Sequence, residues 1–416
     1  MRNFDRIKVL YLSLDGMTDP LGQSQVIAYL KRISTKNVEY DIVSFEKPEV
    51  YKGRKARIEQ ELAGTSITWH PLEYSNKYSF LSTYFLLQEG WKKVEQLHKF
   101  KKFDIVHCRA QLVATLGYKL KTKYGVKFIF DMRGWWTDEK FESGARSGAI
   151  YKPLYKYLKS QEQKFFSTAD KVVSLTHIGK DEIVKHGWAK ENKIGVIPTC
   201  VDFDTFQPYT AHQRKIIRVE LGIPADAFVL IYSGSLGGAY NIKDIFKIYE
   251  ALLQHIPQAY LLLLAKTVQG NVKAEIEAFN STAQQKVIVT SAEYKDVHKY
   301  LVASDLGVIL YEIKYSVIGR SPTKLGEYWA SGIPVISPAG IGDVDYIINR
   351  FLGSGSLIKD LSNEESIKDA LQEIVYNRVG KEALRKYALE YYDIDNGVQF
   401  YEALYRGLIK NNRLSS

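Results

Sequence analysis

The segment Ser321–Ser337 (SPTKLGEYWASGIPVIS) carries a lysine and a glutamate one helical turn apart, Lys324 and Glu327. Ser321 and Pro322 predict a helix start, with the serine as N-cap and the proline at the first helical position. Lys324 then adds a cation where the helix dipole is already positive, a cost that a bound anion would reverse. The first turn and its lysine could therefore bind a diphosphate, and Glu327 could accept hydrogen bonds from ribose hydroxyls. An exposed Lys324–Glu327 pair without a ligand explains the same spacing.

A second segment, Tyr232–Asp244 (YSGSLGGAYNIKD), places three glycines between a predicted strand and a predicted helix. Gly234, Gly237 and Gly238 would let the backbone approach a ligand closely. Their spacing fits neither the Walker pattern nor the dinucleotide pattern G-x-G-x-x-G. A phosphate-binding loop and an ordinary strand-to-helix turn are both open at this point.

Two loops in the first half could receive a second substrate. In Asp15–Leu30, Gly22 precedes Gln23 at an expected helix start after the first predicted strand. In Phe130–Lys140 (FDMRGWWTDEK), two tryptophans stand among charged residues, a combination that suits recognition of a polar ring. The residues concerned are Asp131, Arg133, Trp135, Trp136, Asp138 and Glu139. A surface loop with its own ion pairs is the alternative.

The sequence gives little support to zinc or serine-hydrolase chemistry. D-x-D pairs occur at Asp202/Asp204 and Asp343/Asp345, but such pairs are common by chance and the first adjoins a predicted hinge. None of the eight histidines stands at metal-ligand spacing to another histidine or to a cysteine. The sequence also lacks a G-x-S-x-G segment.

The elements that must position these residues alternate between apolar strands and amphipathic helices. Strand candidates include IKVLYLSL and FDIVHC in the first half and FVLIYSG and LGVILY in the second. Near-continuous apolar strands separated by helices predict parallel sheets covered on both faces. The series restarts after Val196–Pro208, so we place a boundary near residue 200. The expected fold is α/β, with two doubly wound Rossmann-like domains facing across a cleft.

Charge is distributed unevenly along the 416-residue chain, whose formal net charge is +10. The first 200 residues carry an excess of roughly +12 and the remainder roughly −2. A basic first half would suit nucleic acid, an anionic bilayer or an anionic substrate, or would simply be solvated. No apolar run approaches the roughly 20 residues that span a bilayer, and the N-terminus reads as a strand rather than a signal peptide. The two cysteines, Cys108 and Cys200, favour a reduced, cytoplasmic protein.

In this order the segments resemble those of the retaining, nucleotide-sugar-dependent glycosyltransferases of GT-B architecture, in the glycosyl transferases group 1 (family four). KIGVIPTCVDFDTFQP is similar to the linker of that family, SPTKLGEYWASGIPVIS to its donor-site helix, and LVASDLGVIL to the strand before that helix. DPLGQSQVIAYL is similar to the glycine loop of the first domain, and DMRGWWTDE to its acceptor-side loop. The five matches span nearly the whole chain.

The resemblance implies an acceptor-binding domain at 1–200, a nucleotide-sugar-binding domain at 201–385, and C-terminal helices at 386–416 that pack back on the first domain. The donor-binding residues that it implies are Gly234, Ser235, Lys266, Thr290, Arg320, Ser321, Pro322, Thr323, Lys324 and Glu327. On the acceptor side it implies Gly22, Gln23 and Trp135. The candidate catalytic residues are Asp131, Arg133, Glu139 and Lys324.

Three positions depart from the family pattern. Gly319 stands where the first glutamate of E-x(7)-E is expected, Ser235 where an arginine is expected, and Asn241 where a lysine is expected. Lys266, Arg320 and Lys324 are then the candidates for the missing phosphate-binding cations. A weak or inactive relative that binds a nucleotide or a glycan is the alternative.

The resemblance implies sugar transfer with retention of configuration, without a metal or another cofactor. The expected partners are a nucleoside-diphosphate sugar and a glycan or lipid-linked acceptor of cell-surface polysaccharide or glycolipid synthesis, with no role for nucleic acid. Basic, aromatic stretches such as WKKVEQLHKFKKF and YKPLYKYLKSQEQKFF could rest on the anionic inner face of a membrane. A nicotinamide-dependent oxidoreductase would need a dinucleotide loop that the sequence lacks.

Overall fold

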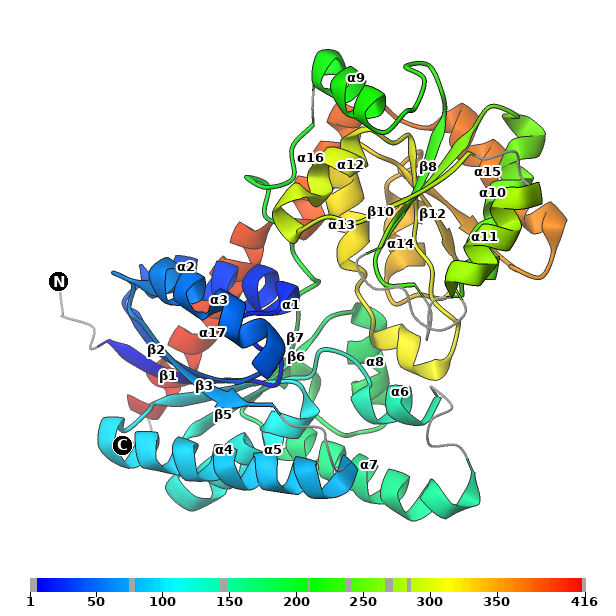
Figure 1. Cartoon of the computed structure of the whole chain (residues 1–416). Helices are drawn as coiled ribbons and strands as arrows, with labels where there is room; N and C mark the ends of the chain where they lie inside the picture. Colours follow the sequence, from blue (N-terminus) through cyan, green and yellow to red (C-terminus); the bar gives the residue numbers. More distant parts are fainter. Residues whose placement is uncertain are drawn as a thin grey trace. The chain divides into compact units, whose positions relative to one another are not determined.

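The computed structural model describes residues 6–74, 79–142, 148–208, 210–236, 241–265, 272–282 and 286–413. The chain forms two compact units, Met1–Pro198 with Ile394–Ser416, and Thr199–Asp393. Each unit contains one parallel sheet with helices on both faces, so the predicted α/β fold with two Rossmann-like sheets is confirmed (Figure 1).

The sheet of the first unit has the strand order β3-β2-β1-β4-β5-β6-β7. Its strands are β1 (Ile7–Ser13), β2 (Val38–Glu46), β3 (Ile67–Glu73), β4 (Ile105–Arg109), β5 (Lys127–Asp131), β6 (Lys171–Ser174) and β7 (Ile194–Val196). Its helices are α1 (Pro20–Gly22), α2 (Ala28–Ser34), α3 (Pro48–Leu62), α4 (Ser79–Lys101), α5 (Gln111–Tyr124), α6 (Trp136–Glu142), α7 (Lys152–Thr168), α8 (His177–Lys185) and α17 (Ile394–Arg413), with a π-helical turn η1 (Gln23–Ile27) and short 3₁₀ turns η2 (Ala149–Tyr151) and η3 (Glu191–Lys193).

The strand order of the first unit reverses direction between β1 and β4. In open α/β sheets, ligands bind at the carboxyl ends of the strands at such a switch point. Ser13, Arg109 and Asp131, the last residues of β1, β4 and β5, are aligned there in register. Side chains at aligned positions of parallel strands point to the same face, so the two charged residues lie side by side.

The sheet of the second unit has the strand order β10-β9-β8-β11-β12-β13, and its switch point lies between β8 and β11. Its strands are β8 (Val229–Ser233), β9 (Tyr260–Leu264), β10 (Val287–Thr290), β11 (Leu306–Val308), β12 (Val335–Pro338) and β13 (Gly355–Ile358). Its helices are α9 (Ala211–Glu220), α10 (Ile242–His255), α11 (Val272–Thr282), α12 (Val297–Val302), α13 (Thr323–Ala330), α14 (Val344–Arg350), α15 (Glu364–Asn377) and α16 (Lys381–Tyr392), with 3₁₀ turns η4 (Tyr294–Asp296) and η5 (Tyr315–Gly319).

The second sheet is buried on both faces, as its continuous apolar strands predict. Along β8, Leu230 and Tyr232 face a core formed with α10 and α15. Val229 and Ile231 face a second core formed with α13, α14 and α16. The two-residue alternation of the strand thus attaches α13 to one side of β8 and leaves the carboxyl end of β8 beside the first turn of α13.

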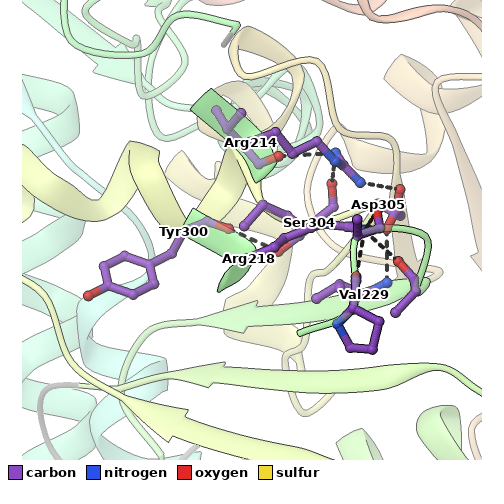
Figure 2. A network of polar contacts seen from close by, with 11 residues as sticks. Arg214, Arg218, Val229, Tyr300, Ser304 and Asp305 are labelled. Atoms are coloured by element: carbon purple, nitrogen blue, oxygen red, sulfur yellow. Dashed lines mark hydrogen bonds and ion pairs between the residues drawn. The ribbon is translucent and has the colours of Figure 1, made fainter. Parts of the chain in front are cut away.

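At the opposite, amino-terminal edge of this sheet, two arginines of α9 and Asp305 join β8 and β11 (Figure 2). Arg214 and Arg218 donate to the two carboxylate oxygens of Asp305 at 2.6 and 2.7 Å. The same carboxylate accepts the N–H of Val229 at 2.9 Å. The network fixes the edge that lies away from the carboxyl ends of the strands.

Two local expectations differ from the structure. The second unit extends to Asp393, whereas the sequence prediction ended its domain at residue 385, inside α16; only α17 belongs to the first unit. The prediction that Ser321 caps α13 is wrong, because Pro322 is the N-cap and Thr323 the first helical residue. The Ser321 hydroxyl accepts the N–H of Thr199 at 3.1 Å, so it is already engaged away from the helix.

Candidate active site

The first turn of α13 presents Lys324 at the carboxyl end of β8. The ammonium of Lys324 lies 4.3 Å from the centroid of the Tyr232 ring, and the Tyr232 hydroxyl donates to the carbonyl of Ser235 at 2.9 Å. Gly234 has φ +141° at this point, and a methyl group on it would lie 2.6 Å from the Lys324 nitrogen. Only glycine fits both that backbone angle and the neighbouring ammonium.

Burial perturbs both charged groups of this turn. Removal from water lowers the pKa of Lys324 to about 8, although the Glu327 carboxylate pulls in the opposite direction. Burial raises the pKa of Glu327, which is 7% exposed, to about 7, while Lys324 and a hydrogen bond from Tyr294 oppose that rise. A cation and a carboxyl group held this way are poised to gain from a ligand that supplies an anion and hydroxyl groups.

Close packing fixes the orientation of α13. The hydroxyl of Tyr328 accepts the N–H of Ser233 at 3.1 Å, and its ring covers Gly307, where a methyl group would lie 2.5 Å from a ring carbon. On the other side, a methyl group on Gly326 would lie 2.7 Å from Val201. These two glycines therefore let α13 approach β11 and the segment after residue 198 closely.

The remaining predicted donor residues lie in the second unit at the same edge or immediately before α13. Ser235 follows Gly234, Thr290 ends β10, and Arg320 follows η5 with its N–H donating to the Val317 carbonyl at 3.0 Å. Pro322 and Thr323 form the N-cap and the first residue of the helix. Lys266 lies outside the described residues, as do Gly237 and Gly238.

In the first unit, Asp131 is buried at the end of β5. One of its carboxylate oxygens accepts the Tyr401 hydroxyl at 3.0 Å and lies 3.4 Å from the His107 Nε2. Burial alone would raise the pKa of Asp131, but Arg133, His107 and Arg109 hold it below its usual value. Burial lowers the pKa of His107. Asp131 is therefore a buried carboxylate in a cationic surrounding.

Strained backbone surrounds this carboxylate. Arg133 has φ +55°, and its guanidinium lies 3.8 Å from Asp131. Ala110, which follows β4, has φ +82° and ψ +159°, a region that is otherwise occupied by glycine. Such strain persists only where the surrounding structure enforces it, and it gathers at functional sites.

Of the predicted acceptor-side residues, Trp135 has a structural role. Trp135 is 1% exposed and packs against Phe166 and Trp188, so its ring is not placed to stack on a sugar. Glu139 lies in α6, where its backbone N–H donates to the Trp135 carbonyl at 2.9 Å, and its carboxylate stays a predicted catalytic group.

The glycine loop of the first unit begins its helix earlier than the sequence predicts. Its first turn starts at Pro20 and places Gly22 inside α1, where a methyl group would lie 2.0 Å from the Gly16 carbonyl oxygen. Gln23 begins the π-helical turn η1, and its side-chain amide donates to the Thr18 carbonyl at 3.3 Å. Buried Glu46 anchors the loop by accepting the N–H groups of Met17 and Thr18 at 2.7 and 3.1 Å.

Several residues of the two candidate sites escaped the sequence reasoning. Tyr232 and Tyr294 flank the Lys324–Glu327 pair, and Arg109, His107 and Tyr401 surround Asp131. Arg109 could have been predicted from the sequence, because it is a charged residue at the carboxyl end of an apolar strand (FDIVHCR). No such pattern marks Tyr401, because α17 reaches Asp131 from 270 residues further along the chain.

Within the described ranges, no cluster of three or more histidine, cysteine or acidic side chains could hold a metal ion. In that same part of the chain, no helix is both long and apolar enough to cross a bilayer.

Family models match most of the chain. Glycosyltransferase Family 4 matches residues 22–205, and Glycosyl transferases group 1 matches residues 213–391. A D-inositol 3-phosphate glycosyltransferase of Nocardioides sp. is 23% identical over 305 residues, which cover 69% of this chain and 63% of that relative. The aligned part thus spans less than two thirds of the curated relative's length.

Solved structures share the fold along nearly the full chain. A glycosyltransferase from Rickettsia africae has a TM-score of 0.71 at 16% identity, covering 98% of this chain and 100% of that one. Anabaena Alr3699/HepE, solved in complex with UDP and glucose, has a TM-score of 0.69 at 15% identity, covering 96% and 99%. At these identities the likeness shows the fold alone.

Proposed function

Because this chain belongs to the family 4 glycosyltransferases of the glycosyl transferases group 1, we propose that it transfers a sugar from a nucleoside-diphosphate sugar to a glycan or lipid-linked acceptor. Transfer retains the anomeric configuration and uses no metal ion. The acceptor belongs to the synthesis of a cell-surface polysaccharide or glycolipid. UDP and glucose bound to the structural neighbour from Anabaena make a UDP-sugar the first donor to test.

One observation carries the proposal: Lys324 in the first turn of α13 and Glu327 one turn further along are buried together, with Gly234 against the lysine ammonium. The diphosphate of the donor binds the N–H groups of that turn and Lys324. The Glu327 carboxylate accepts hydrogen bonds from the ribose. A ligand that supplies both interactions offsets the burial of the two charges.

In the proposed reaction the bond between the anomeric carbon and the diphosphate oxygen breaks while the acceptor hydroxyl bonds to that carbon from the same face. The hydroxyl proton leaves with the departing diphosphate. Lys324 and the helix N-terminus stabilise the negative charge that develops on the leaving group, and that charge is larger in the transition state than in the bound donor. The side chains thereby supply the charge stabilisation that a divalent cation provides elsewhere.

The test is a binding and turnover screen of the full chain with UDP-, GDP- and related nucleotide sugars in excess EDTA. We expect at least one nucleotide sugar to raise the melting temperature and to be hydrolysed slowly or transferred. Glu327→Ala should abolish turnover. Failure of the whole panel to bind would contradict the proposal, whereas binding without turnover would favour a nucleotide-binding relative that lacks activity. Restoration of activity only by added metal would contradict the metal-free mechanism.

The proposed place of action is an anionic membrane surface. The exposed side of α7 carries Lys152, Lys156 and Lys164 together with the exposed ring of Tyr157. The acidic residue of α7, Glu162, is buried and paired with Lys159, so it does not neutralise that side. A basic and aromatic helix face of this kind suits anionic lipid headgroups.

A further inference from the structure

Arg109 is buried as deeply as a structural arginine yet lacks the partners of one. Its side chain is 4% exposed, and its Nε and Nη1 donate no hydrogen bond to any residue in the described part of the chain. Its one ion pair there, to Asp15 at 3.3 Å, joins it to a carboxylate that is 39% exposed. A buried guanidinium left in this state costs stability unless something else binds it.

Arg218 provides the comparison within the same chain. It is 2% exposed and donates five hydrogen bonds, one to Asp305 and the others to backbone carbonyls (Figure 2). Folding alone therefore satisfies a buried arginine fully where the arginine serves the fold. Arg109 is held in place without that satisfaction, as expected of a group that serves a ligand.

The surroundings of Arg109 carry an excess of buried positive charge. Arg109 and Asp131 end neighbouring strands in register, and Arg133 lies 3.8 Å from Asp131. The charges of Arg109 and Arg133 thus both act on one deeply buried carboxylate, since Asp15 is partly in water. One oxygen of that carboxylate, Oδ1, also has no hydrogen-bond partner among the described residues. An added anion would balance the charge, and a ligand hydroxyl would satisfy the free oxygen.

The backbone holds these groups in position at a cost. Ala110, directly after β4, and Arg133, two residues after β5, have positive φ angles. These ends adjoin the switch point of the first sheet, where doubly wound folds bind their ligands. Strain and unpaired buried polar groups therefore coincide at one place.

We propose that the acceptor of this enzyme carries an anionic group, a phosphate or a carboxylate, which binds Arg109 and Arg133 at the carboxyl edge of the first sheet. The planar guanidinium of Arg109 takes two oxygens of that group in place of its contact with Asp15. A hydroxyl of the same acceptor donates to Asp131 Oδ1. The proposal rests on the proposed function, because it names the class of acceptor for that transfer.

The test measures binding of three matched probes to the full chain by ligand-detected NMR: glucose 6-phosphate, glucuronate and glucose. We expect one or both charged probes to bind at least tenfold more tightly than glucose, and their ranking tells phosphate from carboxylate. Arg109→Gln should weaken the charged probe at least tenfold. Arg57→Gln removes the same charge from an exposed site on α3 and should leave binding unchanged.

Three outcomes would overturn the proposal. Glucose and the charged probes could bind equally well, or Arg109→Gln could bind the charged probe as tightly as wild type. In the third outcome, Lys324→Gln loses binding of the charged probe and Arg109→Gln keeps it. Arg109→Lys keeps the charge, covers the case in which the glutamine variant does not fold, and should still lose several-fold because an ammonium cannot bind two oxygens side by side. Binding of the same panel of nucleotide sugars is measured on the same samples. Failure of the whole panel to bind, alongside Arg109-dependent binding of the charged probe, would refute the proposed function and leave the anion site standing.

Discussion

Lys324 gives the proposed donor site a signature in pH, because its pKa of about 8 lies within the working range. Only the ammonium form attracts a diphosphate, so nucleotide affinity should fall as pH rises through 8, approaching about tenfold per pH unit. Lys324→Gln should bind UDP about 100-fold more weakly and lose that dependence. Calorimetric titration with UDP between pH 7 and 9.5 measures both effects. A variant that keeps the wild-type pH profile would show that another group titrates.

The pKa shifts of the same pair also predict how stability depends on pH without a ligand. Glu327 titrates near 7 in the folded chain against an ordinary value of 4.5, so its contribution is present below pH 4.5 and lost as pH rises through 7. Lys324 has a lowered pKa, so its contribution is present above 10.5 and lost as pH falls through 8. The unfolding free energy of wild type, measured with urea, should therefore decline between pH 4 and pH 8. That of Glu327→Gln should not. Parallel pH profiles of unfolding free energy in wild type and Glu327→Gln would show that Glu327 is not the titrating group.

Gly234 tests whether the position of the Lys324 ammonium matters. Alanine at this position meets the ammonium at 2.6 Å and a strained φ of +141°, so we expect at least a tenfold loss of nucleotide affinity and about 1–2 kcal/mol of stability. Gly222→Ala is the matched control, since Gly222 has φ +68° with nothing within 4 Å. It should lose about 1 kcal/mol of stability and bind nucleotide normally. Equal affinity losses in both variants would show a general effect of strain.

At the residue scale, the sequence predicted groups that act through local spacing and missed those that act through the fold. Lys324 and Glu327 lie one turn apart on a single helix, so their proximity can be read directly. Tyr294 joins them from η4, about 30 residues earlier, and no local pattern encodes that contact. Trp135 gave the opposite error: an aromatic residue among charges looks exposed in the sequence, but the ring is buried against Phe166 of α7 and Trp188, which follows α8.

The network of Asp305 shows how the second unit anchors elements away from the site (Figure 2). Asp305→Asn leaves the guanidinium of Arg218, 2% exposed, without its carboxylate. Losing one partner of a buried pair should cost about 2–4 kcal/mol of unfolding free energy. Nucleotide affinity should stay unchanged, because the network lies at the amino-terminal edge of the sheet. Denaturant unfolding and UDP titration measure the two quantities.

Glu390→Gln is the control for that prediction, since it removes a carboxylate from an exposed pair with Arg350 in the same unit. Exposed pairs contribute little, so its unfolding midpoint should not change. A stability loss in Asp305→Asn no larger than that of Glu390→Gln would mean that water replaces the carboxylate.

At the element scale, strands were predictable and helix starts were not. Buried parallel strands are continuous apolar runs, which the sequence displays without ambiguity. The start of α13 was misplaced by one residue because Ser321 binds Thr199, a partner more than 100 residues away. The helix after β1 begins at Pro20, where the Glu46 carboxylate fixes the preceding loop from another strand. Helix boundaries therefore depend on tertiary hydrogen bonds that composition does not reveal.

For the whole molecule, the repeated strand–helix series was enough to predict two sheets of the same kind. The return of the chain at its C-terminus was harder to place, because α16 and α17 follow each other with only Asp393 between them. Their burial separates them: Tyr392 belongs to the core of the second unit, whereas Tyr401 bonds to Asp131 of the first. Both helices are amphipathic, so periodicity alone cannot say which unit each one covers.

The uneven charge of the chain leads to the last prediction, which concerns the proposed membrane surface. Each lysine near an anionic bilayer contributes about 1 kcal/mol, so changing Lys152, Lys156 and Lys164 of α7 to glutamine should weaken binding to phosphatidylserine vesicles about 100-fold. Flotation of the full chain with vesicles measures the change. Wild type should bind poorly to phosphatidylcholine vesicles and should detach in about 0.5 M salt, where charges are screened within a few ångströms.

If only the net charge of the protein mattered, removal of any three exposed lysines would weaken vesicle binding equally. A second triple variant therefore distinguishes attraction by the α7 side from attraction by the whole molecule. Lys215, Lys273 and Lys386 are exposed on the second unit, and their triple glutamine variant carries the same net charge as the α7 variant. If the α7 side is the membrane surface, the second variant should bind like wild type, because it keeps the three lysines of α7. Equal weakening in the two variants would mean that attraction is spread over the molecule. If both variants bind vesicles like wild type, the basic charge of the first 200 residues does not serve membrane binding. It would then serve the anionic acceptor that Arg109 is proposed to bind.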